Sequence, residues 1–182
     1  MVTCCSPASG MGGREVRNGI DHGQIFDHHY VEFNYPSGAV ISSQCRHQPG
    51  THRNVSETFQ GTKAVISTNK NIAQMIDHNG NSLFKYNPKG DKSPYQIEHD
   101  KLFASIRSGG VINNTEYGAK STLTSIMGRM ATYTGKKITW DQALNSNDIL
   151  APDNLDWNSP APVLPDENGK YPVAVPGVFK IN

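Results

Sequence analysis

Histidine is the residue type in this chain whose spacing most invites a chemical interpretation. Around the first predicted hairpin lie His22, Asp27, His28, His29, His47 and His52. Imidazole nitrogens are common zinc ligands, so three converging histidines would form a metal site. However, neighbouring strand residues such as His28 and His29 point to opposite faces, and neither an H-x-H nor an H-E-x-x-H spacing occurs. We therefore predict no metal site and expect these side chains to make ordinary hydrogen bonds.

Three arginines near the same hairpin could bind carboxylates or sugar hydroxyls. Arg14 and Arg17 flank a glycine-rich turn, and Arg46 ends a predicted strand. The guanidinium fork suits both kinds of ligand, although a surface ion pair remains the favoured interpretation for any single arginine. Together with two histidines, they form the predicted substrate-binding set: Arg14, Arg17, His22, Arg46 and His47. No residue is predicted to be catalytic.

Three other features do not support catalysis. Gly10–Gly13 lacks the preceding strand and following helix of a dinucleotide-binding fingerprint, so we expect a tight loop. Tyr117 and Lys120 are three residues apart, whereas the Tyr/Lys pair of short-chain dehydrogenases is spaced by four. Cys45 lies on the predicted apolar face of a strand, which indicates a small core residue rather than a nucleophile.

Composition excludes several classes of protein. The chain has 182 residues, with 17 Lys and Arg against 16 Asp and Glu, giving a net charge of +1 and no basic cluster for nucleic acid. It contains no apolar run of the roughly 20 residues that a membrane helix needs. Its 3 cysteines form no disulfide framework, and the first residues do not resemble a secretory signal. A cytoplasmic location is expected.

The elements that would position these residues change type along the chain. Alternating residues predict a hairpin of Asp27–Tyr35 and Ala39–Arg46 with one buried face. An antiparallel meander is predicted for Ser56–Gln60, Lys63–Ser67, Asn71–Asp77 and Ser82–Tyr86. Two helices are predicted next. The first begins with a capping box at Ser93–Gln96 and ends at Gly109, and the second runs from Asn114 or Thr115 to Gly135. A short strand (Lys137–Trp140) and a helical turn (Asp141–Asn145) are predicted after them. The predicted class is α+β: an open, mainly antiparallel sheet with helices packed on one face.

The last part of the chain differs in character. Residues 146–182 hold 6 of the 11 prolines, which exclude a long helix or a central strand. The same segment is too rich in large apolar residues, such as Trp157 and Phe179, for a typical disordered tail. We predict one α+β substrate and oligomerisation domain over residues 1–145. Residues 146–182 are predicted to form an extended arm that packs on that domain or on a neighbouring subunit.

A set of short motifs adds a family resemblance. The motifs are Gly10–Gly19, Ile25–His29, Gln44–Arg46, Gly61–Lys63, Tyr117–Thr122, Gly128–Ala131 and Leu164–Pro172. In this order they resemble the C-terminal half of Gfo/Idh/MocA oxidoreductases, the relatives of glucose–fructose oxidoreductase and inositol dehydrogenase. The resemblance covers nearly the whole chain from about Gly10, and its motifs are specific to one bacterial branch of the family.

The resemblance implies an NAD(P)-dependent enzyme that acts on sugars or cyclitols and forms homo-oligomers through the sheet face and the C-terminal arm. In that family the nucleotide fingerprint and the catalytic residues precede the region matched here, and no position of this chain corresponds to them. We therefore expect this polypeptide alone to bind no cofactor and to be inactive. Two alternatives remain: a non-catalytic assembly module, and a small metal-dependent enzyme that uses the hairpin histidines.

Overall fold

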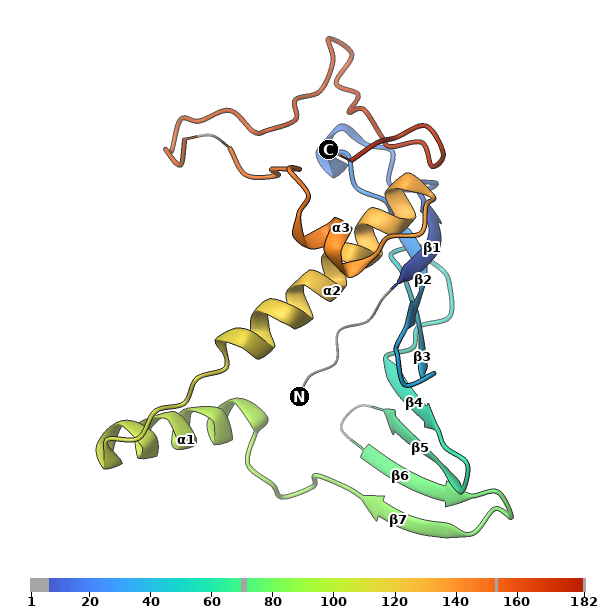
Figure 1. Cartoon of the computed structure of the whole chain (residues 1–182), viewed down its shortest axis with the longest axis vertical. Helices are drawn as coiled ribbons and strands as arrows, with labels where there is room; N and C mark the ends of the chain where they lie inside the picture. The colour runs from blue at the N-terminus through green and yellow to red at the C-terminus, as the bar shows by residue number, and fades with distance from the viewer. Residues whose placement is uncertain (1–6, 70–71, 153, 182) are drawn as a thin grey trace. The chain divides into compact units, whose positions relative to one another are not determined.

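The structure, a computed structural model, describes residues 7–69, 72–152 and 154–181 (Figure 1). It forms two compact units: the first comprises Met1–Pro49 and Asn114–Asn182, and the second comprises Gly50–Asn113. Strands and helices are both present, and every strand pair is antiparallel. The predicted α+β class and open antiparallel arrangement are confirmed, with the strands divided between two sheets.

The first unit contains a three-stranded sheet with the strand order β1-β2-β3. Its elements are β1 (Ala8–Gly13), β2 (His28–Asn34), β3 (Val40–Arg46), α2 (Thr115–Thr134) and α3 (Trp140–Leu144), with a 3-10 turn at Ile20–His22. The predicted hairpin is confirmed, because β2 and β3 pair through Val31 with Ser43 and Phe33 with Ile41. Val31 and Phe33 are buried, as their alternation predicts.

The glycine-rich run forms strand β1, so the predicted tight loop at Gly10–Gly13 is wrong. These glycines let two backbones approach closely. A Cβ atom on Gly10 would lie 2.4 Å from the carbonyl oxygen of Tyr30, and one on Gly12 would lie 2.7 Å from that of His28. Strand interiors use glycine at such contacts, and a run without side chains shows no alternation that could predict the strand.

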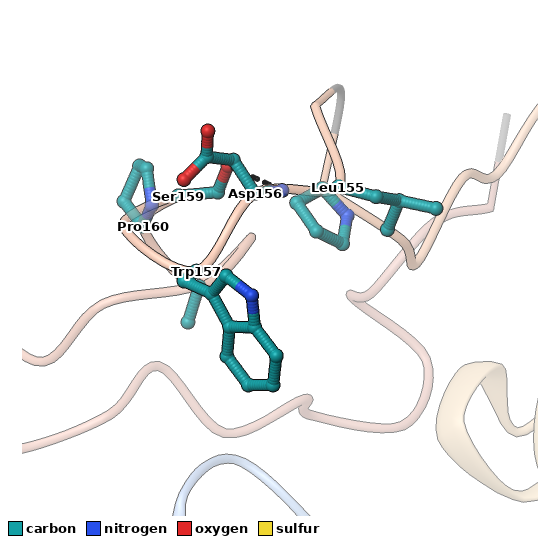
Figure 2. Close-up of a pocket in the computed structure, with 7 residues that line it drawn as sticks. Leu155, Asp156, Trp157, Ser159 and Pro160 are labelled. Carbon is teal, nitrogen blue, oxygen red and sulfur yellow. Dashed lines mark hydrogen bonds between the residues drawn. The ribbon is translucent and has the colours of Figure 1, made fainter.

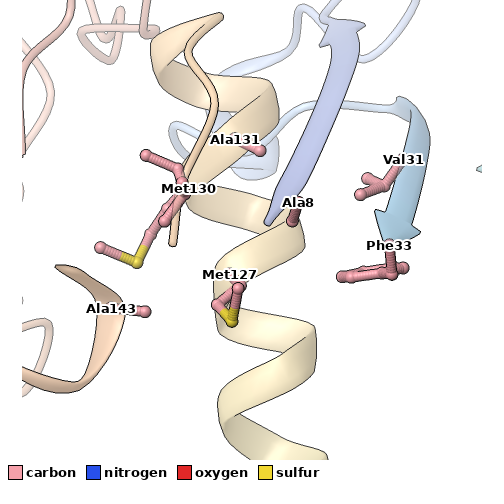
Figure 3. Close-up of a cluster of buried hydrophobic side chains, with 8 residues drawn as sticks. Ala8, Val31, Phe33, Met127, Met130, Ala131 and Ala143 are labelled. Atoms are coloured by element: carbon pink, nitrogen blue, oxygen red, sulfur yellow. The ribbon is translucent and has the colours of Figure 1, made fainter. Parts of the chain in front are cut away.

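The core of the first unit lies between α2 and one face of this sheet (Figure 3). Its buried members are Ala8, Val31, Phe33, Met127, Met130, Ala131, Ile138 and Ala143. Gly128 allows the helix to approach the sheet, since a Cβ there would lie 2.9 Å from Cζ of Phe33. The helix therefore packs through a small-residue contact flanked by methionines, which fill irregular gaps well.

The structure corrects the prediction of a buried Cys45. This residue pairs with His29 across the sheet, so it lies on the core-side face, but it is exposed along with the rest of β3. The α2 residues that form the core pack against β1 and β2, and β3 is the edge strand beyond them. The hairpin is thus buried on one strand only.

The end of α2 follows the sequence prediction, but the next segment does not. Gly135 ends the helix with a left-handed φ of 68°. The predicted strand Lys137–Trp140 is wrong: Ile138 makes an isolated bridge with Ala8, and Trp140 already begins α3. Thr139 caps α3, because its hydroxyl accepts from the backbone N–H of Gln142 at 3.2 Å.

The second unit contains a four-stranded antiparallel sheet in sequential order, which confirms the predicted meander. Its elements are β4 (Ser56–Gln60), β5 (Ala64–Asn69), β6 (Ile72–Asp77), β7 (Ser82–Tyr86) and α1 (Pro94–Ser108). The predicted start of one strand at Asn71 lies outside the described residues. Gly80 supplies a φ of 88° in the turn between β6 and β7. Helix α1 ends at Gly109 as predicted, but Ser93 makes no side-chain capping bond, so the predicted capping box is wrong.

One face of this second sheet carries a row of apolar side chains. Phe59 pairs with Ile66, Ile66 with Met75, and Met75 with Phe84, which places one apolar residue from every strand in line. The neighbouring row on the opposite face is polar and includes Thr58, Ser67, Gln74 and Lys85. Phe59 and Phe84 are 59% and 53% exposed. We call Phe59, Ile66, Met75 and Phe84 the apolar row.

The C-terminal segment, residues 146–182, belongs to the first unit and packs near its own end against the rest of that unit. The backbone N–H of Gly177 donates to the carbonyl of Thr134 at 2.7 Å, and the rings of Phe179 and Tyr133 lie 6.3 Å apart edge to face. Ile181 packs against the core.

Within the described residues, none of the helices has the length and apolar character needed to cross a bilayer.

Candidate functional site

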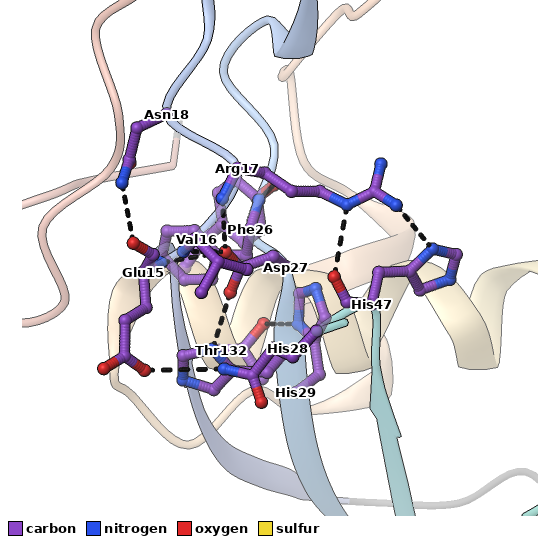
Figure 4. Close-up of polar contacts among 12 residues, drawn as sticks. Glu15, Val16, Arg17, Asn18, Phe26, Asp27, His28, His29, His47 and Thr132 are labelled. Atoms are coloured by element: carbon purple, nitrogen blue, oxygen red, sulfur yellow. Dashed lines mark hydrogen bonds and ion pairs between the residues drawn. The ribbon is translucent and has the colours of Figure 1, made fainter. Parts of the chain in front are cut away.

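The carboxylate of Asp27 organises the polar end of the first unit (Figure 4). Its Oδ2 accepts hydrogen bonds from the backbone N–H groups of Glu15, Val16 and Arg17 at 2.9, 2.7 and 3.0 Å. Its Oδ1 lies 2.8 Å from Nδ1 of His28. One buried side chain therefore fixes the loop that follows β1 and the first side chain of β2.

These contacts also keep Asp27 ionised. Burial alone opposes the charge, but the hydrogen bonds from Arg17, Glu15, His28 and Val16 outweigh it and hold the pKa of this carboxyl well below its usual range. The side chain of Asp27 is fully buried. A buried carboxylate with this many donors is a fixed negative charge at neutral pH.

Two of the predicted binding residues, Arg17 and His47, lie together beside this loop. Nε of Arg17 donates to the carbonyl oxygen of His47 at 3.3 Å, and Nη2 lies 3.3 Å from Nδ1 of the same histidine. The backbone N–H of His47 donates to the carbonyl of Asp27 at 2.8 Å. The structure thus joins two residues that are 30 positions apart in the sequence.

Arg14 and His22 form a separate pair of contacts inside the loop of residues 14–23. The guanidinium of Arg14 donates to the carbonyl oxygens of Gly23 and Gly19. His22 accepts from the backbone N–H of Gly19 through Nδ1 at 3.1 Å. Both side chains therefore have documented roles in holding the loop, and the prediction that they bind substrate stays a prediction.

Arg46, the fifth predicted residue, lies at the end of β3. It pairs across the sheet with His28, which in turn pairs with Gly13 on β1. Directly paired residues project on the same face of a sheet, so His28 and Arg46 both point away from the core-side face. The predicted set is therefore divided between the loop, the Arg17–His47 contact and this strand end.

On the opposite, core-side face, His29 of β2 lies beside the rings of Phe26 and Tyr133, an aromatic cluster that the sequence does not predict. The rings of Phe26 and Tyr133 stack at 4.1 Å, and Arg129 lies 4.2 Å above the Tyr133 ring. Nδ1 of His29 lies 3.0 Å from the hydroxyl oxygen of Thr132. Burial, followed by the charges of His28 and Arg129, lowers the pKa of His29 below its usual value. The contacts of Phe26 with Tyr133 and of His29 with Thr132 join residues more than 100 positions apart, beyond the range of any local motif.

The described residues show neither a metal-binding cluster nor a glycine-rich nucleotide-binding turn. Their His, Cys, Asp and Glu side chains form no group of three or more that could hold a metal ion. The glycines of the run Gly10–Gly13 lie inside antiparallel strand β1, whereas a pyrophosphate-binding run forms a turn that opens a helix. We therefore assign neither a metal nor an NAD(P) site to this part of the chain.

One open hollow of about 510 Å³ occurs in the C-terminal segment (Figure 2). Its lining residues all come from that segment and include Leu155, Trp157 and Pro160. None of the predicted binding residues lines it. Trp157 is fully exposed at its rim.

Comparisons with known proteins support the fold. No family model matches the chain, and no curated protein matches it. A solved structure of a candidate oxidoreductase from Thermotoga maritima is similar to 75% of this chain, with a TM-score of 0.54 and 19% sequence identity. The chain spans 41% of that protein. At this identity the likeness shows the fold alone: the chain shares the fold of part of that protein.

Proposed function

We propose that this chain is the substrate-binding and oligomerisation domain of an NAD(P)-dependent oxidoreductase of the Gfo/Idh/MocA type, whose substrate is a sugar or a cyclitol. The fold likeness to part of a candidate oxidoreductase carries the proposal. The ordered motifs, from Gly10–Gly19 to Leu164–Pro172, independently favour the same family. In this proposal the chain contributes substrate contacts and assembly, and another domain binds the nicotinamide nucleotide.

The Asp27-centred loop supports a role in substrate binding. It fixes the backbone from which Arg17 projects, and it places that guanidinium beside His47. Arg46 lies on the adjacent strand end. Guanidinium and imidazole groups on a rigid scaffold suit the hydroxyl groups of a polyol, because they offer several hydrogen bonds without reorganisation.

Ligand-observed NMR on the purified chain tests this proposal. We expect myo-inositol or glucose to show saturation transfer, and cyclohexanol, which has one hydroxyl, to show none. Arg17→Ala should weaken polyol binding by about threefold to tenfold, since one or two hydrogen bonds are lost. Arg53→Ala, a change at an exposed arginine of the second unit, is the matched control. Absence of polyol binding, or micromolar binding of NADH to this chain alone, would contradict the proposal.

The apolar row supports a role in oligomerisation. The apolar row ends in the exposed rings of Phe59 and Phe84, with Ile66 and Met75 half-buried between them, and monomeric proteins usually cover such a surface. We propose that a second copy of this chain covers it. Such an interface would be apolar at its centre, as homodimer interfaces are. The C-terminal segment, whose Trp157 is fully exposed, is the second proposed contact with a neighbouring subunit.

Light scattering tests the assembly. We expect the wild-type chain to be larger than a monomer at micromolar concentration and Phe84→Ser to shift it toward the monomer. Lys85→Ser changes the adjacent residue, which points to the opposite face, and should leave the mass unchanged. If self-association is seen without polyol binding, a non-catalytic assembly module becomes the better description. A wild-type monomer would exclude both assembly roles.

A further inference from the structure

We propose that Nε2 of His28, oriented by Asp27, is a hydrogen-bond acceptor for a hydroxyl group of the ligand, with Arg46 as the neighbouring donor. This inference rests on the proposed function, because it takes the ligand to be a polyhydroxy compound. It adds a recognition group that lies outside the predicted set of binding residues. The residues that carry it are Asp27, His28, Gly13 and Arg46.

The contact with Asp27 determines which ring nitrogen of His28 carries the proton. Asp27 is a carboxylate whose Oδ2 already accepts from three backbone N–H groups, and an ionised carboxylate can only accept hydrogen bonds. Its Oδ1 lies 2.8 Å from Nδ1 of His28, so Nδ1 must carry the proton that is donated in this contact. In the neutral ring, Nε2 then carries a lone pair and acts as an acceptor.

Nε2 of His28 is accessible to a ligand. The side chain of His28 is 38% exposed, and Nε2 has no hydrogen-bond partner within the described residues. The cross-strand neighbour is Gly13, and a Cβ there would lie 3.4 Å from Nε2 and 3.3 Å from Cε1. Glycine at this position leaves that edge of the ring clear. The lone pair is therefore held in a fixed direction at a surface that a ligand can reach.

Strand β3, the other neighbour of β2, places Arg46 beside His28. Arg46 pairs directly with His28, which places the two Cβ atoms about 5 Å apart on one face. A hydroxyl group both donates and accepts, so it can donate to Nε2 and accept from a guanidinium. A carboxylate or phosphate could use the arginine but would place its lone pairs against that of Nε2. The pairing therefore favours a neutral hydroxyl over an anion.

The tautomer can be tested without any ligand. We expect long-range ¹⁵N–¹H NMR spectra to show His28 protonated on Nδ1 in the neutral wild-type chain. In Asp27→Asn the carboxamide oxygen can still accept from the loop while its NH₂ group donates to Nδ1, which moves the ring proton to Nε2. A wild-type ring protonated on Nε2, or one whose tautomer does not change in Asp27→Asn, would overturn the inference.

Binding of myo-inositol tests the recognition step. We expect His28→Ala and Asp27→Asn each to weaken it about threefold to tenfold, as loss of one hydrogen bond predicts. The matched control is His78→Ala, in the second unit, where the imidazole Nε2 lies 3.1 Å from the carbonyl of Gly61. If wild type and His28→Ala bind equally, this inference fails and the proposed function stands. If the wild-type chain binds no polyol, both fail.

Discussion

In the first unit the apolar face of the β1–β2 pair meets α2, whereas in the second unit the apolar row of the β4–β7 sheet is half-buried at its centre and exposed at both ends. All the buried residues among those described belong to the first unit, including Met127, Ala131 and Tyr133. The second unit has four strands paired in sequential order, yet none of its described residues is buried.

The comparison separates two contributions to structure. Hydrogen-bonded pairing and turn residues are enough to define the second sheet, but its apolar side chains are at most half-buried. The first unit adds a helix that fits closely, because Gly128 lets α2 approach Phe33. Since burial of apolar surface is the main favourable contribution to folding, the first unit should hold most of the stability of the isolated chain.

The largest expected effect comes from removing a core side chain. Met127→Ala should lower the free energy of unfolding of the first unit by about 3 kcal/mol, because Met127 is fully buried and leaves a cavity. Phe84→Ala in the second unit should cost about 1 kcal/mol or less, since that ring is already half exposed. Native-state hydrogen exchange measures both units in one experiment. Equal losses of protection would contradict the comparison.

Substitutions at two glycines should change the stability of the first unit by smaller amounts and in opposite directions. Gly10→Ala should destabilise the first unit by about 1–3 kcal/mol, because its Cβ would clash with the backbone at Tyr30. Gly118→Ala, in open space within α2, should instead stabilise by up to about 1 kcal/mol through helix propensity. Thermal unfolding followed by circular dichroism compares the two variants. A stabilising Gly10→Ala would mean that β1 is not held against β2.

The parts of this fold that could be predicted are those specified by local residues. Gly109 and Gly135 end their helices in the left-handed region as expected, and Asn79-Gly80 forms a turn between strands. Strand β1 could not be predicted, because its glycines are required by the partner backbone and not by any pattern of their own. Cys45 shares a face with buried residues, but its burial depends on how far α2 extends over the sheet.

The candidate site, like the fold, could be predicted only in part from the sequence. The sequence predicts both Arg17 and His47 as binding residues, but their contact across 30 positions depends on Asp27, whose role the sequence hardly indicates. A weak signal existed, since an aspartate directly before a histidine at the start of an alternating strand can orient it. The contact between His29 and Thr132 had no such signal, because the two residues lie 103 positions apart.

The smallest expected effect is a dependence of the first unit's stability on pH. Burial, together with the charges of His28 and Arg129, lowers the pKa of His29, so the folded chain binds its proton less readily than the unfolded chain does. The contribution is therefore fully present above the ordinary value of about 6.5 and is lost as the pH falls from there toward the lower folded pKa. Urea unfolding between pH 7.5 and pH 5 should show this loss in wild type and a smaller one in His29→Gln. Equal losses in both would show that other groups cause the dependence, and an NMR titration of His29 would then show an unshifted midpoint.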